Sequence, residues 1–200
     1  MGPIGQLLSS VKTCINTSLI VQFNHLFLSL LYMIEHIIDS IGFNGPIILF
    51  ITSMIYLYVK NSYFTIYVIG FMFSGLINYI LKGVFKQPRP IDDKHLFNLE
   101  KMYRSVLTFE NYGMPSGHAQ SVFYSTTFTY LALENNVLLV GALFISLLTI
   151  YQRVQSKQHF LFQTIVGAII GSILGFAFYK YAKNQLQGPI KPKEDDYGPI

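Results

Sequence analysis

Long apolar runs separated by short polar segments constrain this chain more than any other feature of its sequence. The run over residues 63–81 is close to the roughly 20 residues that a helix needs to cross the hydrocarbon core of a bilayer. Further apolar runs occupy 19–38, 47–59, 121–133, 137–151 and 159–181. With 52% hydrophobic and 12% charged residues and a mean hydropathy of +0.42, the chain falls outside the range of soluble globular proteins. The sequence therefore predicts an all-α, polytopic integral membrane protein, a bundle of about six helices.

The two N-terminal runs are less regular than the others. Polar side chains fall on one side of a helix drawn over residues 19–38: Gln22, His25, Ser29 and His36. This pattern suits either a span that faces neighbouring helices, which we favour, or a helix that lies in the membrane interface. The stretch 42–46, Gly-Phe-Asn-Gly-Pro, predicts a break in the chain. The short run 47–59 would then form a separate span by recruiting flanking residues.

The charge of the chain favours lipid over nucleic acid as its partner. The net charge is only +4, and the positive residues stand mainly at the ends of apolar runs. Lipid headgroups explain this placement better than nucleic acid does. We therefore expect membrane lipids as partners and no nucleic acid.

A quartet at the boundary between a polar loop and an apolar run is the first candidate for chemistry. Pro115 presets its backbone dihedral, Ser116 can cap a helix, Gly117 permits close approach, and His118 falls in the first turn. The start of a helix offers unpaired N–H groups and a positive dipole end, which can hold an anion such as phosphate. A capped helix entry uses the same residues for purely structural reasons, so the quartet alone leaves both interpretations open.

Two further stretches place charged and titratable residues at similar boundaries. Lys82 is followed after six residues by Arg89, and Arg153 is followed after five residues by His159. The run that ends at Lys82 delivers Lys82 and Arg89 to one membrane face. The next span departs from that face after His118, and the helical hairpin that follows returns to it at Arg153 and His159. All five side chains are therefore predicted to share one membrane face.

The three cations suit phosphoryl chemistry as a set. Lys82, Arg89 and Arg153 could neutralise the equatorial oxygens of a phosphoryl group. The backbone N–H groups of Ser116 and Gly117 could complete the cradle. Taken singly, each cation is better explained as a side chain that snorkels or binds a lipid headgroup. Their spacing, together with two histidines, favours a phosphate-binding site.

These stretches resemble the signature of the type 2 phosphatidic acid phosphatase superfamily. That signature reads Lys-x6-Arg-Pro, then Pro-Ser-Gly-His, then Ser-Arg-x5-His-x3-Asp, and the resemblance covers residues 77–171. It implies the helical bundle that this superfamily shares with chloroperoxidases. It also implies His159 as the nucleophile that forms a phosphohistidine. His118 would protonate the leaving oxygen and later act as the base that activates water.

Two positions depart from the superfamily pattern. Gln152 stands where the family has Ser, and Gln163 stands where it usually has Asp. His-x3-Gln, preceded by Tyr-Gly-Met-Pro-Ser, is most similar to the dolichyl diphosphatase branch. Because Gln163 follows His159 by one helical turn, we expect its amide oxygen to accept the Nδ1–H of His159. A neutral Gln stabilises an imidazolium less than Asp does, which is tolerable when the leaving group is a phosphate ester.

The sequence thus predicts a lipid phosphatase that cleaves a polyprenyl (dolichyl-type) diphosphate to the monophosphate and inorganic phosphate. One alternative is a phosphatase for phosphatidic acid or another lipid monophosphate. Another is a non-catalytic membrane protein that binds phospholipid headgroups. Asp92, Asp93 and His95 could be imagined as metal ligands, but such an exposed cluster is usually a solvated loop, so we expect no metal and no cofactor.

The remaining expectations concern the layout of the chain. Residues 1–183 would form one phosphatase domain, and 184–200 a flexible tail. Residues 95–103 could form an amphipathic segment at the membrane surface. Small residues recur every four positions along the last run and predict a helix-packing face: Gly167, Gly171 and Gly175. The positive residues on the two faces are nearly balanced, so orientation rests on the resemblance, which implies an endoplasmic reticulum membrane with the site facing the lumen.

Overall fold

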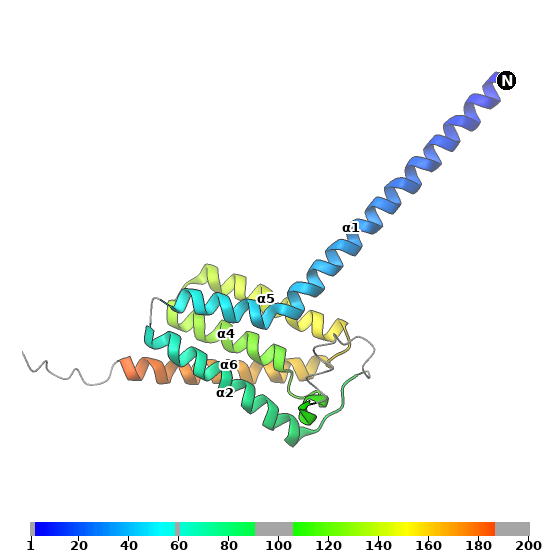
Figure 1. The fold of residues 1–200 in the computed structure, drawn as a ribbon. Coiled ribbons are helices and arrows are strands. Elements are labelled where there is room, and N and C mark those ends of the chain that lie inside the picture. Colours follow the sequence, from blue (N-terminus) through cyan, green and yellow to red (C-terminus); the bar gives the residue numbers. More distant parts are fainter. Residues whose placement is uncertain (1–2, 59–60, 91–105, 187–200) are drawn as a thin grey trace, which may run out of the picture. The chain divides into compact units, whose positions relative to one another are not determined.

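The protein is all-α in the part of the chain that the structure, a computed structural model, describes: residues 3–58, 61–90 and 106–186. The described residues hold five α-helices and one short 3-10 helix (Figure 1). The elements are α1 Pro3–Leu57, α2 Asn61–Phe85, η1 Thr108–Asn111, α4 Gly117–Leu133, α5 Asn136–Gln155 and α6 Leu161–Leu186. Two compact units divide the chain, Met1–Ser40 and Ile41–Ile200. In the first unit, α1 exposes almost all of its described side chains.

The expected break at 42–46 is wrong, which reduces the predicted six helices to five in the described residues. The helix continues through Pro46 because this stretch packs against α5 instead of turning. A Cβ on Gly42 would lie 2.5 Å from the Cβ of Gln152, and one on Gly45 would lie 3.3 Å from the Cβ of Thr149. Such small residues mark turns in water-soluble proteins. In this protein they let α1 and α5 approach closely. Gly42 also leaves room for Gln152, the residue that replaces the family Ser.

Helix α4 lies at the centre of the second unit, where it packs against α2, α5 and α6 (Figure 1). Its aromatic side chains enter the core, with the Phe128 ring centroid 5.3 Å from that of Tyr67 on α2. Hydroxyl groups link the helices inside this core. Tyr67 Oη lies 2.8 Å from Ser125 Oγ, and Thr129 Oγ1 donates to Ser53 Oγ on α1 at 2.8 Å. Such contacts satisfy polar groups where water is excluded.

The predicted packing face on α6 is confirmed. A Cβ on Gly167 would lie 2.5 Å from the carbonyl oxygen of Ser116, and one on Gly175 would lie 2.8 Å from that of Tyr124. Gly171 likewise faces the backbone of Gln120. The three glycines therefore bring the backbones of α4 and α6 together, which places the start of α4 beside the start of α6.

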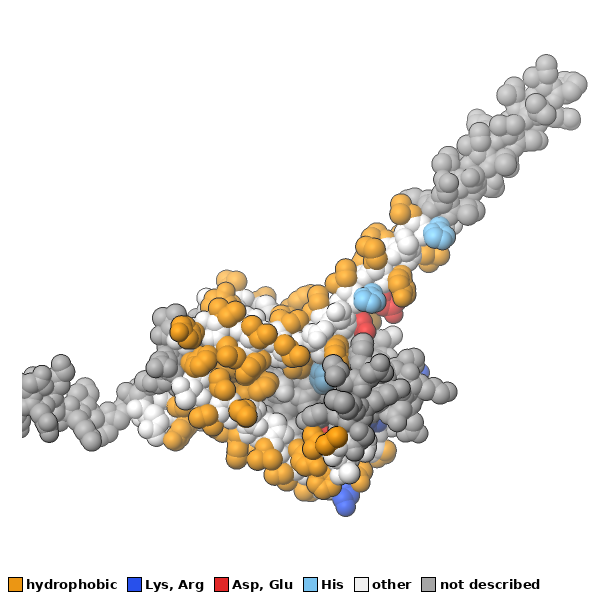
Figure 2. Space-filling model, in the orientation of Figure 1, with side chains coloured by type: hydrophobic (Ala, Val, Ile, Leu, Met, Phe, Trp, Pro, Cys, Tyr) orange, Lys and Arg blue, Asp and Glu red, His pale blue; other side chains and the backbone are white. Residues whose placement is uncertain are grey.

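Four helical segments are long and apolar enough to cross a membrane: Asn24–Leu57, Tyr63–Phe85, Asn136–Gln155 and Leu161–Gln185. Their outer faces expose large apolar side chains such as Met72, Phe144 and Ile173. Figure 2 shows hydrophobic side chains spread over the surface of these helices. Such a surface suits lipid, because a soluble protein rarely exposes apolar patches of this extent. The chain is a multi-pass membrane protein.

Candidate active site

Lys82 lies in the last turn of α2, where the helix leaves the apolar layer. Its side chain is only 3% exposed and forms an ion pair with the carboxylate of Glu110 on η1. The segment after α2 then carries Arg89 back toward the same region. Both cations of the first motif therefore meet η1, although the sequence places η1 over twenty residues further on.

The guanidinium of Arg89 joins two loops. Its Nη2 donates to the carbonyl oxygen of Glu110 at 2.8 Å, and its Nε donates to that of Asn111 at 3.3 Å. Its Nη1 lies 3.1 Å from both the carbonyl oxygen of Gln158 and the Nε2 of His159. These contacts use the planar fork of Arg, which Lys could not reproduce.

The loop between α5 and α6 explains the spacing of Arg153 and His159. The carbonyl oxygen of Arg153 accepts hydrogen bonds from the backbone N–H groups of Gln158 and His159, both at 3.1 Å. The chain thus turns back on the end of α5, so a residue six positions later lies beside Arg153. The Arg153 side chain is 1% exposed, and its Cζ lies 5.8 Å from the ring centroid of Phe43 on α1.

Helix α4 begins as the sequence predicts, with one difference at Ser116. Ser116 is the N-cap, and its hydroxyl accepts from the backbone N–H of Ala119 at 3.5 Å. Its own N–H donates to the carbonyl oxygen of Gln163 at 3.1 Å, so this N–H is already used and the expected phosphate contact from it is wrong. His118 lies in the first turn, with its ring centroid 5.6 Å from that of Phe43.

His159 is buried, and its neighbours define which ring nitrogen carries the proton. Its Nδ1 lies 2.8 Å from the carbonyl oxygen of Gly113, which can only accept, and its Nε2 faces Arg89, which can only donate. The proton is therefore on Nδ1, and Nε2 presents a lone pair. Burial lowers the pKa of His159 well below 6.5, and the nearby charges of Arg89, Arg153 and Lys82 lower this pKa further. The imidazole is therefore neutral near pH 7.

The expected hydrogen bond between Gln163 and His159 Nδ1 is wrong, because the carbonyl of Gly113 takes that place. Helix α6 begins only at Leu161, so His159 precedes the helix and the two residues do not share a helical face. Gln163 is fully buried beneath the loops instead. Its Nε2 donates to the carbonyl of Pro88 at 3.0 Å, and a Cβ on Gly113 would lie 2.5 Å from its Oε1. Gln163 therefore supports the segments that carry Arg89 and the Gly113 carbonyl.

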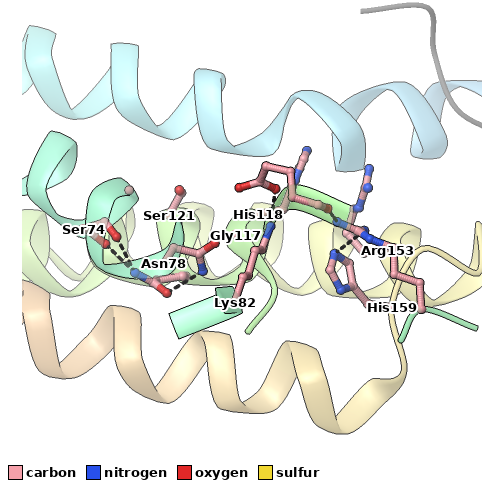
Figure 3. Close-up of a pocket in the computed structure, with 12 residues that line it drawn as sticks. Ser74, Asn78, Lys82, Gly117, His118, Ser121, Arg153 and His159 are labelled. Carbon is pink, nitrogen blue, oxygen red and sulfur yellow. Dashed lines mark hydrogen bonds and ion pairs between the residues drawn. The ribbon is translucent and has the colours of Figure 1, made fainter. Parts of the chain in front are cut away.

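The predicted cations and both predicted histidines line one cavity of about 220 Å³ (Figure 3). We call one part of it the cationic end, formed by Lys82, Arg89, Arg153 and His159. We call the other part the polar end, formed by Ser74, Asn78, Gln120 and Ser121. Figure 3 shows Ser74, Asn78 and Ser121 on one side and Arg153 and His159 on the other. Gly117 and His118 also line the cavity, but Ser116 and Gln163 do not.

Sequence reasoning missed Glu110 and the whole polar end. A signal was available for half of the polar end, since Ser74 and Asn78 precede Lys82 at intervals of four residues and therefore share one face of α2 with it. Gln120 is held in this wall, because its Nε2 donates to the Ser74 carbonyl at 2.7 Å and its Oε1 accepts from Asn78 Nδ2 at 2.7 Å. Glu110 had no such signal, because only the folded loop brings it to Lys82.

An apolar groove of about 520 Å³ adjoins the cavity. The side chains that form this apolar groove come from α1 and α2: Phe43, Pro46, Ile47, Phe50 and Phe71. The cavity and the apolar groove share three lining residues, Gly117, His118 and Ser121. A ligand with a charged head and an apolar chain could therefore occupy both at once.

Other predicted features lie elsewhere. His25 and His36 are exposed in the first unit, away from any motif. Asp92, Asp93, His95 and the segment 95–103 lie outside the described residues, as does 187–200 of the expected tail. Residues 184–186 belong to α6. Within the described ranges, no group of three or more His, Cys, Asp or Glu side chains is placed to hold a metal ion.

The bundle and the cavity define a multi-pass membrane protein with a buried cationic site that contains two imidazoles. The family model of the PAP2 superfamily matches residues 63–187, more than half of the chain. The chain therefore belongs to the PAP2 superfamily, which confirms the resemblance drawn from the motifs.

Among curated proteins, the chain is similar to several dolichyldiphosphatases. It is 27% identical over 166 residues to dolichyldiphosphatase 1 of Rhinolophus ferrumequinum, covering 74% of this chain and 65% of that protein. It is 28% identical over 140 residues to dolichyldiphosphatase 1 of Homo sapiens, covering 62% of this chain and 54% of that protein. It is 30% identical over 122 residues to dolichyldiphosphatase of Saccharomyces cerevisiae, covering 55% and 48%. The chain thus spans less than two thirds of the length of these relatives, and no solved structure matches it.

Proposed function

We propose that this protein is a lipid phosphatase that hydrolyses a polyprenyl (dolichyl-type) diphosphate to the monophosphate and inorganic phosphate. The observation that carries the proposal is the state of His159. Its neutral Nε2 lone pair is directed into a cavity lined by three cations. A buried imidazole in that state is a nucleophile, and the surrounding charge would attract the phosphoryl group that it attacks.

In the first step, His159 Nε2 attacks the terminal phosphorus atom. The bond between phosphorus and the bridging oxygen breaks, and the lipid monophosphate leaves. Lys82, Arg89 and Arg153 stabilise the charge on the transferring phosphoryl oxygens, and Arg89 exchanges its contact with Nε2 for one with an oxygen. The Nδ1–H remains bonded to the carbonyl of Gly113, which stabilises the phosphohistidine.

His118 acts in both steps, from the junction of the cavity and the apolar groove. In the first step it donates a proton to the leaving oxygen. In the second step, water hydrolyses the phosphohistidine with His118 as the base. His118 then takes a proton from the water that attacks phosphorus, which breaks the bond to Nε2 and releases inorganic phosphate. Each turnover thus returns both histidines to their starting states.

The polar end supports a diphosphate over a monophosphate as the substrate. The leaving group of a lipid diphosphate is itself a phosphate ester, which needs hydrogen-bond donors on the far side of His118. Ser121 is at the polar end, and Gly117, the first residue of α4, lines the same cavity. Ser74 Oγ accepts from Gln120 at 2.9 Å, which leaves its own proton to donate. Phosphatidic acid would place an uncharged glycerol oxygen at this position. Gln163 does not support this choice of substrate, because its amide bonds Phe160 and Pro88 while His159 Nδ1 bonds Gly113.

The apolar groove supports a substrate with a long hydrocarbon chain. Because it meets the cavity at His118, a lipid whose terminal phosphate lies at the cationic end can keep its first carbon atoms against Phe43 and Phe71. Such a groove also separates an enzyme that acts on lipids at the membrane from one that acts on soluble phosphates.

Purified protein in detergent, assayed with polyprenyl diphosphate and with phosphatidic acid, tests the proposal. We expect phosphate release from the diphosphate, abolished in His159→Ala and retained in His25→Ala, which removes an exposed histidine outside the cavity. Faster release from phosphatidic acid would favour a lipid monophosphate phosphatase. Lipid binding without any release would favour the headgroup-binding alternative. A phosphorylated protein whose label is labile in acid and stable in alkali would identify the phosphohistidine.

We also propose that the reaction needs no divalent metal. The cations that neutralise phosphate come from the protein, and among the described residues the carboxylate that lines the cavity, Glu110, pairs with Lys82. Activity should persist in EDTA, and complete loss restored by magnesium would contradict this.

Location in the endoplasmic reticulum with the cavity facing the lumen remains a prediction, which glycosylation tags placed in the loops would test.

A further inference from the structure

Glu110 places a carboxylate inside the cationic end, where an anionic ligand would have to bind. Its side chain is 17% exposed and pairs with Lys82, and it lines the same cavity as Arg89, Arg153 and His159. A carboxylate and a phosphate present the same kind of charged oxygen to an ammonium group. Lys82 is therefore already bound to an anion supplied by the protein.

The backbone around Glu110 holds this carboxylate in place. Arg89 bonds the carbonyl oxygens of Glu110 and Asn111. On the other side, the Phe109 ring centroid lies 5.0 Å from that of Tyr79, and a Cβ on Gly83 would lie 2.7 Å from Phe109 Cε2. Since η1 is held against α2 on one side and by Arg89 on the other, its backbone keeps the Glu110 side chain within reach of Lys82.

We propose that Glu110 is an internal counter-anion that competes with phosphate for Lys82 and keeps the affinity of the site for inorganic phosphate low. A phosphate at the cationic end would have to displace the carboxylate from Lys82 or share the ammonium with it, and the two anions repel each other. Only the consequence for turnover rests on the proposed function: there, the competition would help the product, inorganic phosphate, to leave.

A different role for Glu110 predicts the opposite result. If the carboxylate served only to hold Lys82 in position for phosphate, its removal would leave the ammonium less ordered and phosphate would bind more weakly. The direction of the change in phosphate affinity therefore separates competition from positioning.

The experiment is a calorimetric titration of inorganic phosphate into the purified full chain in detergent. In Glu110→Gln, which keeps the shape and removes the charge, the Kd for inorganic phosphate should fall by about tenfold or more, because like charges at such a site are strongly unfavourable. The matched control is Glu134→Gln, which removes the same charge from an exposed position at the opposite end of α4 and should leave the Kd unchanged. An unchanged or raised Kd in Glu110→Gln would overturn the proposal.

A second variant protects the test against misfolding. Glu110→Asp keeps the charge but withdraws the carboxylate from Lys82 by about one methylene. Its Kd should lie between those of the parent and Glu110→Gln, and a weaker affinity than the parent would count against competition. Because binding needs no turnover, a protein that released no phosphate from lipids but bound inorganic phosphate more tightly in Glu110→Gln would refute the proposed function and leave this inference standing.

Discussion

The cationic end and the polar end of the cavity hold their side chains by different means. At the cationic end, loops far apart in sequence are joined by contacts to main-chain oxygens, such as those from Arg89 to Glu110 and Gln158. At the polar end, side chains of α2 and α4 bond to each other, as Asn78 does to Gln120. The cationic end therefore gathers its charges from several segments around one point, whereas the polar end is a wall of two paired helices. This difference favours catalysis at the first and selection of the leaving group at the second.

The largest effect is expected from Arg89→Lys at the cationic end. Lysine keeps the charge but cannot donate to two loops and a ligand at once, so kcat for the diphosphate should fall by about 10²–10³, the loss typical of one donor that stabilises a transition state. Steady-state kinetics in detergent would measure it. A loss of less than threefold would mean that charge alone, and not the fork of contacts, matters at this end.

A smaller and selective effect is expected from Ser121→Ala at the polar end. Losing one hydrogen bond to a charged phosphate should lower kcat/KM for polyprenyl diphosphate by about tenfold. Turnover of a lipid monophosphate should change little. Ser125→Ala, one turn further along α4 and bonded to Tyr67 instead of lining the cavity, is the control and should keep the parental ratio of the two activities. Equal losses for both substrates in Ser121→Ala would refute a role in selection.

The pH dependence of stability should include a contribution from His159 at the cationic end. Because the folded-state pKa of His159 is lowered, its contribution to stability is fully present above pH 6.5 and is lost as the pH falls below 6.5 toward the folded-state pKa. Between pH 7 and pH 5 the parent should lose about 1 kcal/mol or more relative to His159→Asn, which does not titrate. Unfolding in detergent at each pH would measure the difference. Parallel curves for the two proteins would contradict a buried neutral imidazole.

The smallest effect is expected in the apolar groove, away from the residues that it shares with the cavity. Ile47→Trp should partly fill the apolar groove and lower kcat/KM for a long polyprenyl diphosphate by about threefold, since obstruction of an apolar pocket has modest effects. A short-chain diphosphate should be unaffected. Ile51→Trp, on the same helix but outside the groove, is the matched control. Loss of activity that does not depend on chain length would show that the chain lies elsewhere.

More of the cationic end than of the polar end could be predicted from the sequence, and the reasons are physical. Spacing and crossing count predicted that Lys82, Arg89 and His159 lie on one face, and the cavity brings them together. The contact of Gln163 was mispredicted because periodicity assumes a helix, and α6 begins only after His159. Glu110 was missed because nothing in its local sequence relates it to Lys82.

The fold showed the same limit in its first helix. The rule that Gly and Pro interrupt a chain holds where water can bond the freed backbone. In a bundle of membrane helices a neighbouring helix replaces the water that would bond a broken backbone. Gly42 and Gly45 therefore permit close contact with α5 instead of a turn. Among the residues that the structure describes, one helix therefore replaces the two N-terminal helices that the sequence predicted, and the apolar character of both runs was predicted correctly.

The proton on the proposed nucleophile is fixed by the main-chain oxygen of Gly113, so no exchange of a side chain can delete that bond directly. A change at position 163 reaches that bond only indirectly, through the loop contacts that the amide of Gln163 makes with Pro88 and Phe160. Gly113 is the vulnerable point instead, because even one added methyl group would strike the amide of Gln163. A saturation library should accordingly tolerate fewer residue types at 113 than at 163, and at 163 it should favour residues that keep a hydrogen bond to the loops.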